Sequence, residues 1–251
     1  MKTVLKYTCI SNIGKKRRIN QDNYICDGDY MQIGSKESVI PVRCVPLKAR
    51  RRCLLGVFDG MGGEECGEIA SLIAAECAVK RQAGKDMKAD LLELCRISNE
   101  AICDYADKNG IGTMGTTAAI LDFSKNRIEM CNIGDSKVFR LSDGGLTQIS
   151  VDHYSIAPYG QKPPLSQNLG ISPMEMVIEP YICTVQYKKG DIFLICSDGL
   201  TDMVDNETIK MILKTQPIES ASKSLLSEAL DNGGKDNITI ILSVVEKKLW
   251  D

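Results

Sequence analysis

The sequence has only one histidine, His153, and no pair of cysteines with Cys-x-x-Cys spacing. A zinc site built on several histidines is therefore excluded by counting alone. The eleven cysteines are scattered and odd in number, and several lie inside apolar runs, where cysteine behaves as a small hydrophobic residue. This usage predicts reduced thiols in the cytoplasm rather than a disulfide framework or a cysteine zinc site.

Long apolar runs and a strong net charge are also missing. No run approaches the length that spans a bilayer, and the first residues lack the apolar segment and cleavage site of a signal peptide. A formal net charge of −2 gives no reason to expect nucleic acid or a membrane surface as a partner. The 251 residues contain no internal repeat and no linker, so we expect one domain and a monomer.

Strand-like and helical segments alternate along the chain. We expect strands at 3–10, 23–27, 53–58, 116–122, 127–133, 137–141, 146–149, 176–186, 191–196 and 238–245. We expect helices near 64–80, 206–214 and 218–231, and another with Leu91 to Tyr105 on its apolar side. The segments from 116 to 149 have the spacing of an antiparallel meander, whereas 28–52 is polar and predicted to be irregular. This order predicts an α+β fold with packed β-sheets and helices outside.

Four aspartates stand at the ends of strongly apolar runs: Asp59, Asp135, Asp198 and Asp236. If packed sheets bring these ends together, several carboxylates meet at low dielectric constant, where mutual repulsion raises their pKa values. Divalent cations relieve that repulsion, and an all-oxygen ligand set suits Mg²⁺ or Mn²⁺. The alternative is an ordinary Asp-Gly turn at Asp59 and a hairpin turn at Asp135.

Phosphate chemistry is the use that such a site favours. Two divalent ions that share one carboxylate promote in-line displacement at phosphorus and lower the pKa of a bridging water. Arg17 lies in the first Gly-rich turn, and its planar, always charged guanidinium is suited to hold phosphate oxygens.

Six short motifs run through nearly the whole chain: Gly14–Asp22, Phe58–Gly63 with Gly67–Ser71 after it, Met114–Thr117, Asn132–Lys137, Ser197–Asp202 and Asp236–Thr239. In this order they resemble the metal-dependent serine/threonine protein phosphatases (the PPM or type 2C family), in the compact form common in bacteria. The resemblance implies a single domain over 1–248 with a shortened flap near 154–168. It also implies a central antiparallel β-sandwich flanked on both sides by pairs of antiparallel helices, in α-β-β-α layers.

The resemblance also implies a role for each site residue. Asp59 would bridge two metal ions, Gly60 would offer its carbonyl oxygen to one of them, and Asp198 and Asp236 would bind the other. Asp135, with Asp198, would hold a third, weaker ion.

Two further roles concern the reacting groups. Asp22 would sit against metal-bound water and orient it, and Arg17 would bind the substrate phosphate.

The implied reaction is hydrolysis of phosphoserine or phosphothreonine in proteins by direct attack of a metal-bridging water, with Mn²⁺ or Mg²⁺ as cofactor. Phosphorylated proteins, the targets of a Ser/Thr kinase, would be the partners. Two alternatives remain open from the residues themselves. One is a catalytically weak module that binds phosphoproteins, and the other is a phosphatase of small phosphoesters.

The sequence departs from the family pattern in three places. Met61 stands where many members have histidine, and a thioether cannot donate a proton, so we expect a metal-bound water to protonate the leaving group. Gln21 replaces a glutamate, which removes one negative charge near Gly60. The flap between Asp152 and Leu169 is short, and the family's flap is associated with substrate choice.

Several charged residues have plainer interpretations. We expect Lys15, Lys16 and Arg18 to be surface residues, and Lys48–Arg52 to be a solvated strand flank or, as the alternative, a docking patch. His153 is interpreted as a structural, hydrogen-bonding histidine. Asp202 is expected near the N-terminus of a helix.

Overall fold

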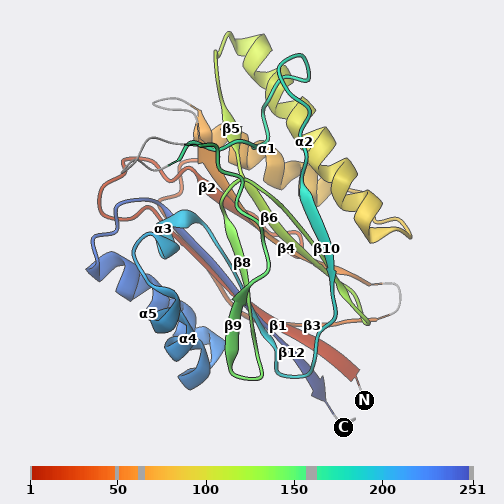
Figure 1. Cartoon of the computed structure of the whole chain (residues 1–251), viewed down its shortest axis with the longest axis vertical. Coiled ribbons are helices and arrows are strands. Elements are labelled where there is room, and N and C mark those ends of the chain that lie inside the picture. Colours follow the sequence, from red (N-terminus) through yellow and green to blue (C-terminus); the bar gives the residue numbers. More distant parts are fainter. Residues whose placement is uncertain (1, 49–50, 62–65, 157–162, 249–251) are drawn as a thin grey trace.

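The computed structural model describes residues 2–48, 51–61, 66–156 and 163–248 (Figure 1). The strands are β1 (Lys2–Asn12), β2 (Asp22–Cys26), β3 (Glu37–Pro46), β4 (Cys53–Met61), β5 (Gly115–Thr116), β6 (Ala118–Phe123), β7 (Ile128–Ile133), β8 (Lys137–Ser142), β9 (Gly145–Gln148), β10 (Tyr181–Val185), β11 (Ile192–Cys196) and β12 (Ile238–Lys248). The helices are α1 (Gly67–Lys80), α2 (Met87–Asn109), α3 (Asp198–Thr201), α4 (Asn206–Thr215) and α5 (Ile218–Asp231).

Two antiparallel sheets form the centre of the molecule. One sheet has the strand order β3-β1-β12-β11-β8-β9, and the other has the order β10-β7-β6-β4-β2 with β5 paired to β4. β1 and β12 pair over their whole length, from Lys2 opposite Lys248 to Asn12 opposite Ile238, so the two chain ends lie side by side (Figure 1). Figure 1 shows α1 and α2 on one side of the sheets and α4 and α5 on the other. The predicted layered α+β sandwich is confirmed.

Three apolar layers hold the sheets and helices together. Between the sheets, Leu5, Val57 and Ile241 are fully buried, and the rings of Phe123 and Phe193 meet edge to face with centroids 5.7 Å apart. A second layer joins α1 and α2 to one sheet, and a third joins α4 and α5 to the other. Because each sheet is covered on both faces, its central strands read as continuous apolar runs rather than alternating ones.

Segment 28–52 was predicted to be irregular, and for much of its length that prediction is wrong. Residues 37–46 form β3, an edge strand that pairs with β1. Most of its side chains are exposed or half-buried, so it lacks the apolar signal of the central strands. Its register shifts opposite Tyr7 and Cys9, beside Pro41, which has no backbone N–H to donate to a ladder.

The expected single meander over 116–149 is also wrong. β6 and β7 pair in one sheet, whereas β8 and β9 pair in the other, so the chain crosses between sheets at Gly134 and Asp135. Gly134 has φ +96°, and a Cβ there would lie 2.6 Å from Thr117 Cγ2. The crossing therefore depends on glycine, and it carries Asp135 to the edge where the two sheets meet.

Two element boundaries also differ from expectation. The strand predicted over 176–186 covers only Tyr181–Val185, because Pro180 directly precedes it and cannot donate to a neighbouring strand. Asp202 ends α3 instead of beginning a helix. The cap of α4 is Asp205, whose carboxylate accepts a hydrogen bond from Thr208 N at 2.8 Å.

No helix in the described ranges combines the length and the apolar character that crossing a bilayer requires.

Candidate metal centre

One cavity of about 420 Å³ collects the four strand-end aspartates. Asp59, Asp135, Asp198 and Asp236 all line it, and Arg17 is the one basic side chain among the described residues of its wall. Gly60, Gln21, Met61 and Thr117 complete much of the remaining lining. Residues that are 177 positions apart in the chain, Asp59 and Asp236, therefore share one pocket.

Strand ends from both sheets place these side chains. Asp59 lies near the end of β4, directly opposite Asp22 at the start of β2. Asp198 is the first residue of α3, two residues after β11 ends at Cys196. Asp236 precedes β12, which pairs with β11, so the two carboxylates lie at neighbouring strand ends.

Asp22 is buried behind the cavity rather than in its wall. Its Oδ2 accepts hydrogen bonds from Ser197 Oγ and Thr239 Oγ1, each at 2.7 Å. Its Oδ1 is buried and has no hydrogen-bond partner in the described part of the chain. Burial raises the pKa of Asp22 to about 7, and the charges of Asp198 and Asp236 add to that rise while the two hydroxyls oppose it.

Asp59 carries the largest electrostatic conflict in the cavity. Burial raises the pKa of its carboxyl well above the ordinary value, and four neighbouring aspartates raise it further: Asp22, Asp198, Asp135 and Asp236. The backbone is fixed, because Asp59 N–H donates to Thr117 Oγ1 at 3.0 Å and Asp59 O accepts from Thr117 N–H at 2.9 Å. The strand end thus holds the carboxylate in a place that penalises its charge.

These residues fit divalent ions. The donors are carboxylate oxygens, together with the Gly60 carbonyl, and the site has more negative charge than Arg17 can balance. The unpartnered Oδ1 of Asp22 is a further oxygen that awaits a partner. Mg²⁺ or Mn²⁺ would provide the missing positive charge.

Two glycines let the backbone close around the cavity. A Cβ on Gly60 would lie 2.1 Å from the carbonyl oxygen of Gly67, at the start of α1. A Cβ on Gly199 would lie 1.9 Å from the carbonyl oxygen of Asn237. Both distances are too short for any other residue, so each aspartate of these Asp-Gly pairs is held by a contact that only glycine permits.

Arg17 and Asp236 form an ion pair that the sequence did not predict. Arg17 Nη2 donates to Asp236 Oδ2 at 2.6 Å, and the other Asp236 oxygen accepts from Asn237 N. That hydrogen bond raises the pKa of Arg17, and the charges of Asp236, Asp59 and Asp198 act in the same direction. Within the described ranges, no three acidic, cysteine or histidine side chains are already grouped around a single point as ion ligands. Arg17 and the backbone of Asn237 each occupy one carboxylate oxygen of Asp236.

Asn237 is a positioning residue for which the sequence analysis named no role. Its Oδ1 accepts from Gln21 N at 2.8 Å, and its Nδ2 donates to the carbonyls of Ile13 and Ile19 at 2.9 and 3.0 Å. One side chain at the start of β12 therefore fixes both ends of the loop that carries Arg17. Its place directly after Asp236, in the last of the six motifs, was the sequence feature that could have identified it as a site residue.

Asp135 lies in the cavity wall and is buried. Its Oδ2 accepts a hydrogen bond from the Tyr154 hydroxyl at 3.1 Å, and its backbone oxygen accepts from Lys137 Nζ at 3.2 Å. His153 donates its backbone N–H to the Gly134 carbonyl at 3.1 Å, and its Nδ1 lies 3.2 Å from the same oxygen. The histidine thus holds the Gly134 turn, as the structural interpretation expected, and Tyr154 is an aromatic neighbour that the sequence did not single out.

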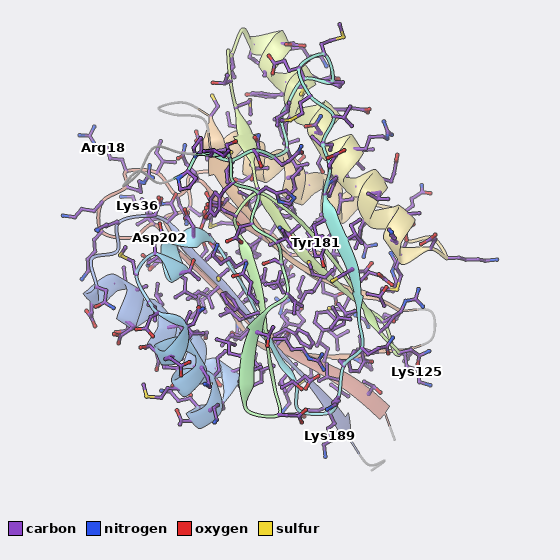
Figure 2. All side chains as sticks on the ribbon, in the orientation of Figure 1. Arg18, Lys36, Lys125, Tyr181, Lys189 and Asp202 are labelled. Carbon is purple, nitrogen blue, oxygen red and sulfur yellow. The ribbon has the colours of Figure 1, made fainter. Side chains whose placement is uncertain are left out.

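The remaining charged residues of the first loop face solvent. Lys15, Lys16 and Arg18 are exposed, and Figure 2 shows Arg18 projecting outward from its loop. Gln21 Nε2 lies 3.5 Å from Glu68 Oε2 at the start of α1. Gly62 and Gly63 of the second motif, and 157–162 of the flap, lie outside the described residues.

The expectation of a solvated flank at Lys48–Arg52 is wrong for Arg52. Its side chain is 11% exposed and lies 2.9 Å from Asp122 and 2.7 Å from Asp90. Arg51 is exposed and pairs with Asp27, whereas Ala49 and Arg50 lie outside the described residues. A run of like charges in the sequence therefore splits into interior and surface roles.

Comparison with known proteins identifies relatives along most of the chain. The family described as protein phosphatase 2C matches residues 47–233. The serine/threonine protein phosphatase PstP of Mycobacterium tuberculosis is 34% identical over 206 residues, which is 76% of this chain and 40% of that protein. The serine/threonine phosphatase stp of Listeria welshimeri is 28% identical over 216 residues, which is 77% of this chain and 84% of that protein.

Solved structures show the same similarity over the whole fold. The crystal structure of the catalytic domain of PstP in complex with two manganese ions has a TM-score of 0.80 and 29% identity. It covers 98% of this chain, and all of that chain is matched. This chain spans about 40% of the length of PstP, the part that includes its catalytic domain. On the match over residues 47–233 and the identity to PstP, the chain belongs to the protein phosphatase 2C family.

Proposed function

We propose that this chain is a metal-dependent phosphatase that hydrolyses phosphoserine and phosphothreonine in proteins. The observation that carries the proposal is the single cavity lined by Asp59, Asp135, Asp198 and Asp236, with Arg17 as its one basic side chain in the described wall. Membership of the protein phosphatase 2C family supports the same reaction, as do the names of the relatives PstP and stp.

Two Mn²⁺ or Mg²⁺ ions are the proposed cofactors, as PstP binds two manganese ions. Asp59 and the Gly60 carbonyl would hold one ion, and Asp59, Asp198 and Asp236 the other, with Asp135 available to a third and weaker one. When bound, such ions supply positive charge at the phosphoryl oxygens and lower the pKa of coordinated water.

The chain's own residues then bind and orient the reactants. One N–H of Arg17 donates to Asp236, and its other N–H groups remain to hold phosphate oxygens in the cavity. Asp22 Oδ2 is fixed by two hydroxyls, so its Oδ1 is a preoriented acceptor for a water proton. The described cavity wall offers no histidine to protonate the leaving group, since His153 is bound to Gly134 and Met61 carries no acidic proton.

The partners we propose are phosphorylated proteins that a Ser/Thr kinase has modified, and the location is the cytoplasm. Apart from Cys66, the cysteines in the described part of the chain are free thiols, which suits a reducing compartment. We also propose that residues 1–248 act as one phosphatase domain whose flap, near 154–168, is shortened.

The test is hydrolysis of p-nitrophenyl phosphate and of a phosphothreonine peptide with Mn²⁺, Mg²⁺ or EDTA. We expect turnover with either metal, none with EDTA, and at least about 10³-fold less in Asp59→Asn. Bound Mn²⁺ should also raise the free energy of unfolding of the wild type, by about 2.7 kcal/mol at a hundredfold excess over its Kd.

Other outcomes would favour the alternatives. Mn²⁺ binding and phosphopeptide binding without turnover would indicate a phosphoprotein-binding module. Rapid hydrolysis of small phosphoesters with negligible turnover of phosphopeptides would indicate a small-molecule phosphatase.

A further inference from the structure

A second and larger cavity lies beside the metal centre. It has a volume of about 790 Å³ and is enclosed by the C-terminal half of α2, residues 111–115 and the segment 168–175. Met61 lines both this cavity and the metal centre, and it pairs with Gly115 in the short β4–β5 ladder. A substrate peptide whose phosphorylated residue lies over the aspartates can therefore extend past Met61 into the second cavity.

The walls of this second cavity are held in place. Asn99 Oδ1 accepts from the backbone N–H groups of Gly170 and Ile171 at 2.7 and 3.0 Å, and Asn99 Nδ2 donates to Ile171 O at 2.9 Å. Leu169 exchanges two backbone hydrogen bonds with Thr116 at 2.9 and 3.0 Å. In Figure 1 the segment that leads to β10 accordingly lies against the upper end of α2. A recognition surface with fixed walls loses less entropy on binding than a mobile one.

The lining combines an apolar floor with acidic side chains. Ile111, Met114 and Ile171 contribute apolar surface, and the acids are Glu100, Asp104, Asp107 and Glu175. No lysine or arginine stands among the described residues of this lining.

Two of the four acids lack a cation in the described part of the chain. Arg96 neutralises Glu100 at 2.5 Å, and Lys108 lies 3.9 Å from Asp104. Asp107, in α2, and Glu175, in the segment 168–175, take part in no ion pair within the described residues. Cys103 also lines the cavity. Burial raises the pKa of its thiol, and the charges of Asp107, Asp104 and Glu175 raise it further, so these three acids lie near the same thiol.

We propose that this cavity, the acidic groove, binds the basic residues next to the phosphorylated serine or threonine of a protein substrate. The proposal rests on the proposed function and adds a substrate class to it. Lysine and arginine suit the groove because their aliphatic stems can cover its apolar floor while their charged ends meet Asp107 and Glu175. Because the groove lies beside the metal centre, it would bind residues close to the phosphorylated one. A separate docking site would bind a distant segment of the substrate.

The test compares two phosphothreonine peptides of equal length, one with arginines and one with glutamines around the phosphorylated residue. Asp107→Asn/Glu175→Gln is the test variant, and both residues are exposed, so the fold should be kept. Glu207→Gln/Glu219→Gln, on α4 and α5 in the opposite helical layer, is the matched control with the same change in net charge.

For the wild type and the control we expect kcat/KM to favour the arginine peptide by about tenfold at low salt, and by less at high salt. In the test variant we expect that preference to vanish through a higher KM, with kcat and the hydrolysis of p-nitrophenyl phosphate unchanged. The proposal would be overturned if the test variant kept the wild-type preference for the arginine peptide, or if the control lost that preference as fully as the test variant. If the wild type did not hydrolyse p-nitrophenyl phosphate, that result would instead count against the proposed function.

Discussion

The strands β4 and β6 connect two clusters of buried charge, one at each end, and the clusters are built in opposite ways. At one end, Asp122 is fully buried and lies within 3.4 Å of Arg81 and 2.9 Å of Arg52. At the other end, Asp59 faces a cavity shared with three more aspartates and Arg17.

The causes of the pKa shifts make the difference explicit. Burial raises the pKa of Asp122 to about 6, and the two arginines oppose that rise. Burial also raises the pKa of Asp59, but there the neighbouring aspartates add to the rise and no arginine among the leading causes opposes it. This chain can evidently supply its own cations to a buried carboxylate. The end at Asp59, called the metal end below, leaves carboxylate oxygens whose negative charge is not compensated. An ion-binding site requires such oxygens.

The largest effect is expected from Asp59→Asn, which removes a charge at the metal end. We expect turnover with Mn²⁺ to fall by at least about 10³-fold, equivalent to about 4 kcal/mol of activation free energy. The free energy of unfolding in EDTA should not fall, because the substitution removes a repulsive charge. Steady-state kinetics and urea denaturation measure the two effects, and a variant that is inactive because it is less stable without metal would contradict the assignment.

The matching change at the other end is Asp122→Asn, and its effect should be the reverse. It leaves Arg52 and Arg81 buried without a full counter-charge, so we expect the free energy of unfolding to fall by about 3 kcal/mol. The kcat and KM of the folded enzyme should stay at wild-type values. Urea denaturation measures the free energy of unfolding, and steady-state kinetics at 20 °C or below measure kcat and KM. A loss of activity without a loss of stability would refute the structural role of Asp122.

The two ends should also differ in their pH dependence. The folded-state pKa of Asp22 is about 7 against an ordinary 3.8, so between these values the folded, metal-free protein binds a proton that the unfolded chain has released. Its stability must then fall as pH rises through this window, by up to about 1.4 kcal/mol per pH unit. Denaturation in EDTA should show that Asp22→Asn makes the slope between pH 6 and 7 shallower, and the remaining slope is due mainly to Asp59, whose pKa is also raised in the folded protein. Asp122→Asn should leave most of the wild-type slope in place, because the pKa of Asp122 is about 6 and its carboxyl is mostly deprotonated within this window.

The smallest expected effect concerns Gln21, which lines the metal end and lies near Glu68. Gln21→Glu adds a negative charge there, so we expect Mn²⁺ to bind roughly threefold more tightly, about 0.7 kcal/mol. Isothermal titration calorimetry measures the Kd, with Glu207→Gln on α4 as a remote charge control. Weaker Mn²⁺ binding in Gln21→Glu would show that position 21 does not face an ion.

Much of this architecture could be predicted from local sequence. The runs that became β4, β11 and β12 are mostly apolar because both faces of each sheet are covered, and the helices α4 and α5 lie within one residue of expectation. Edge strand β3 was missed for the opposite reason, since an exposed strand with a proline has no apolar signature. The pairing of Arg52 with Asp122 could not be foreseen, because nothing in a run of basic residues marks which one turns inward.

The residue types of the site and their places at strand ends can be predicted from local sequence, because an aspartate next to a buried apolar run is a local pattern. The need for glycine at Gly60 and Gly199 comes from the fold instead, since the atoms that a Cβ would meet there belong to Gly67 and Asn237. Three other features required the folded structure: β7 and β8 belong to different sheets, Asn237 holds the loop of Arg17, and Arg17 pairs with Asp236. These are contacts between distant segments, and they depend on how two sheets pack rather than on the order of residues along either one.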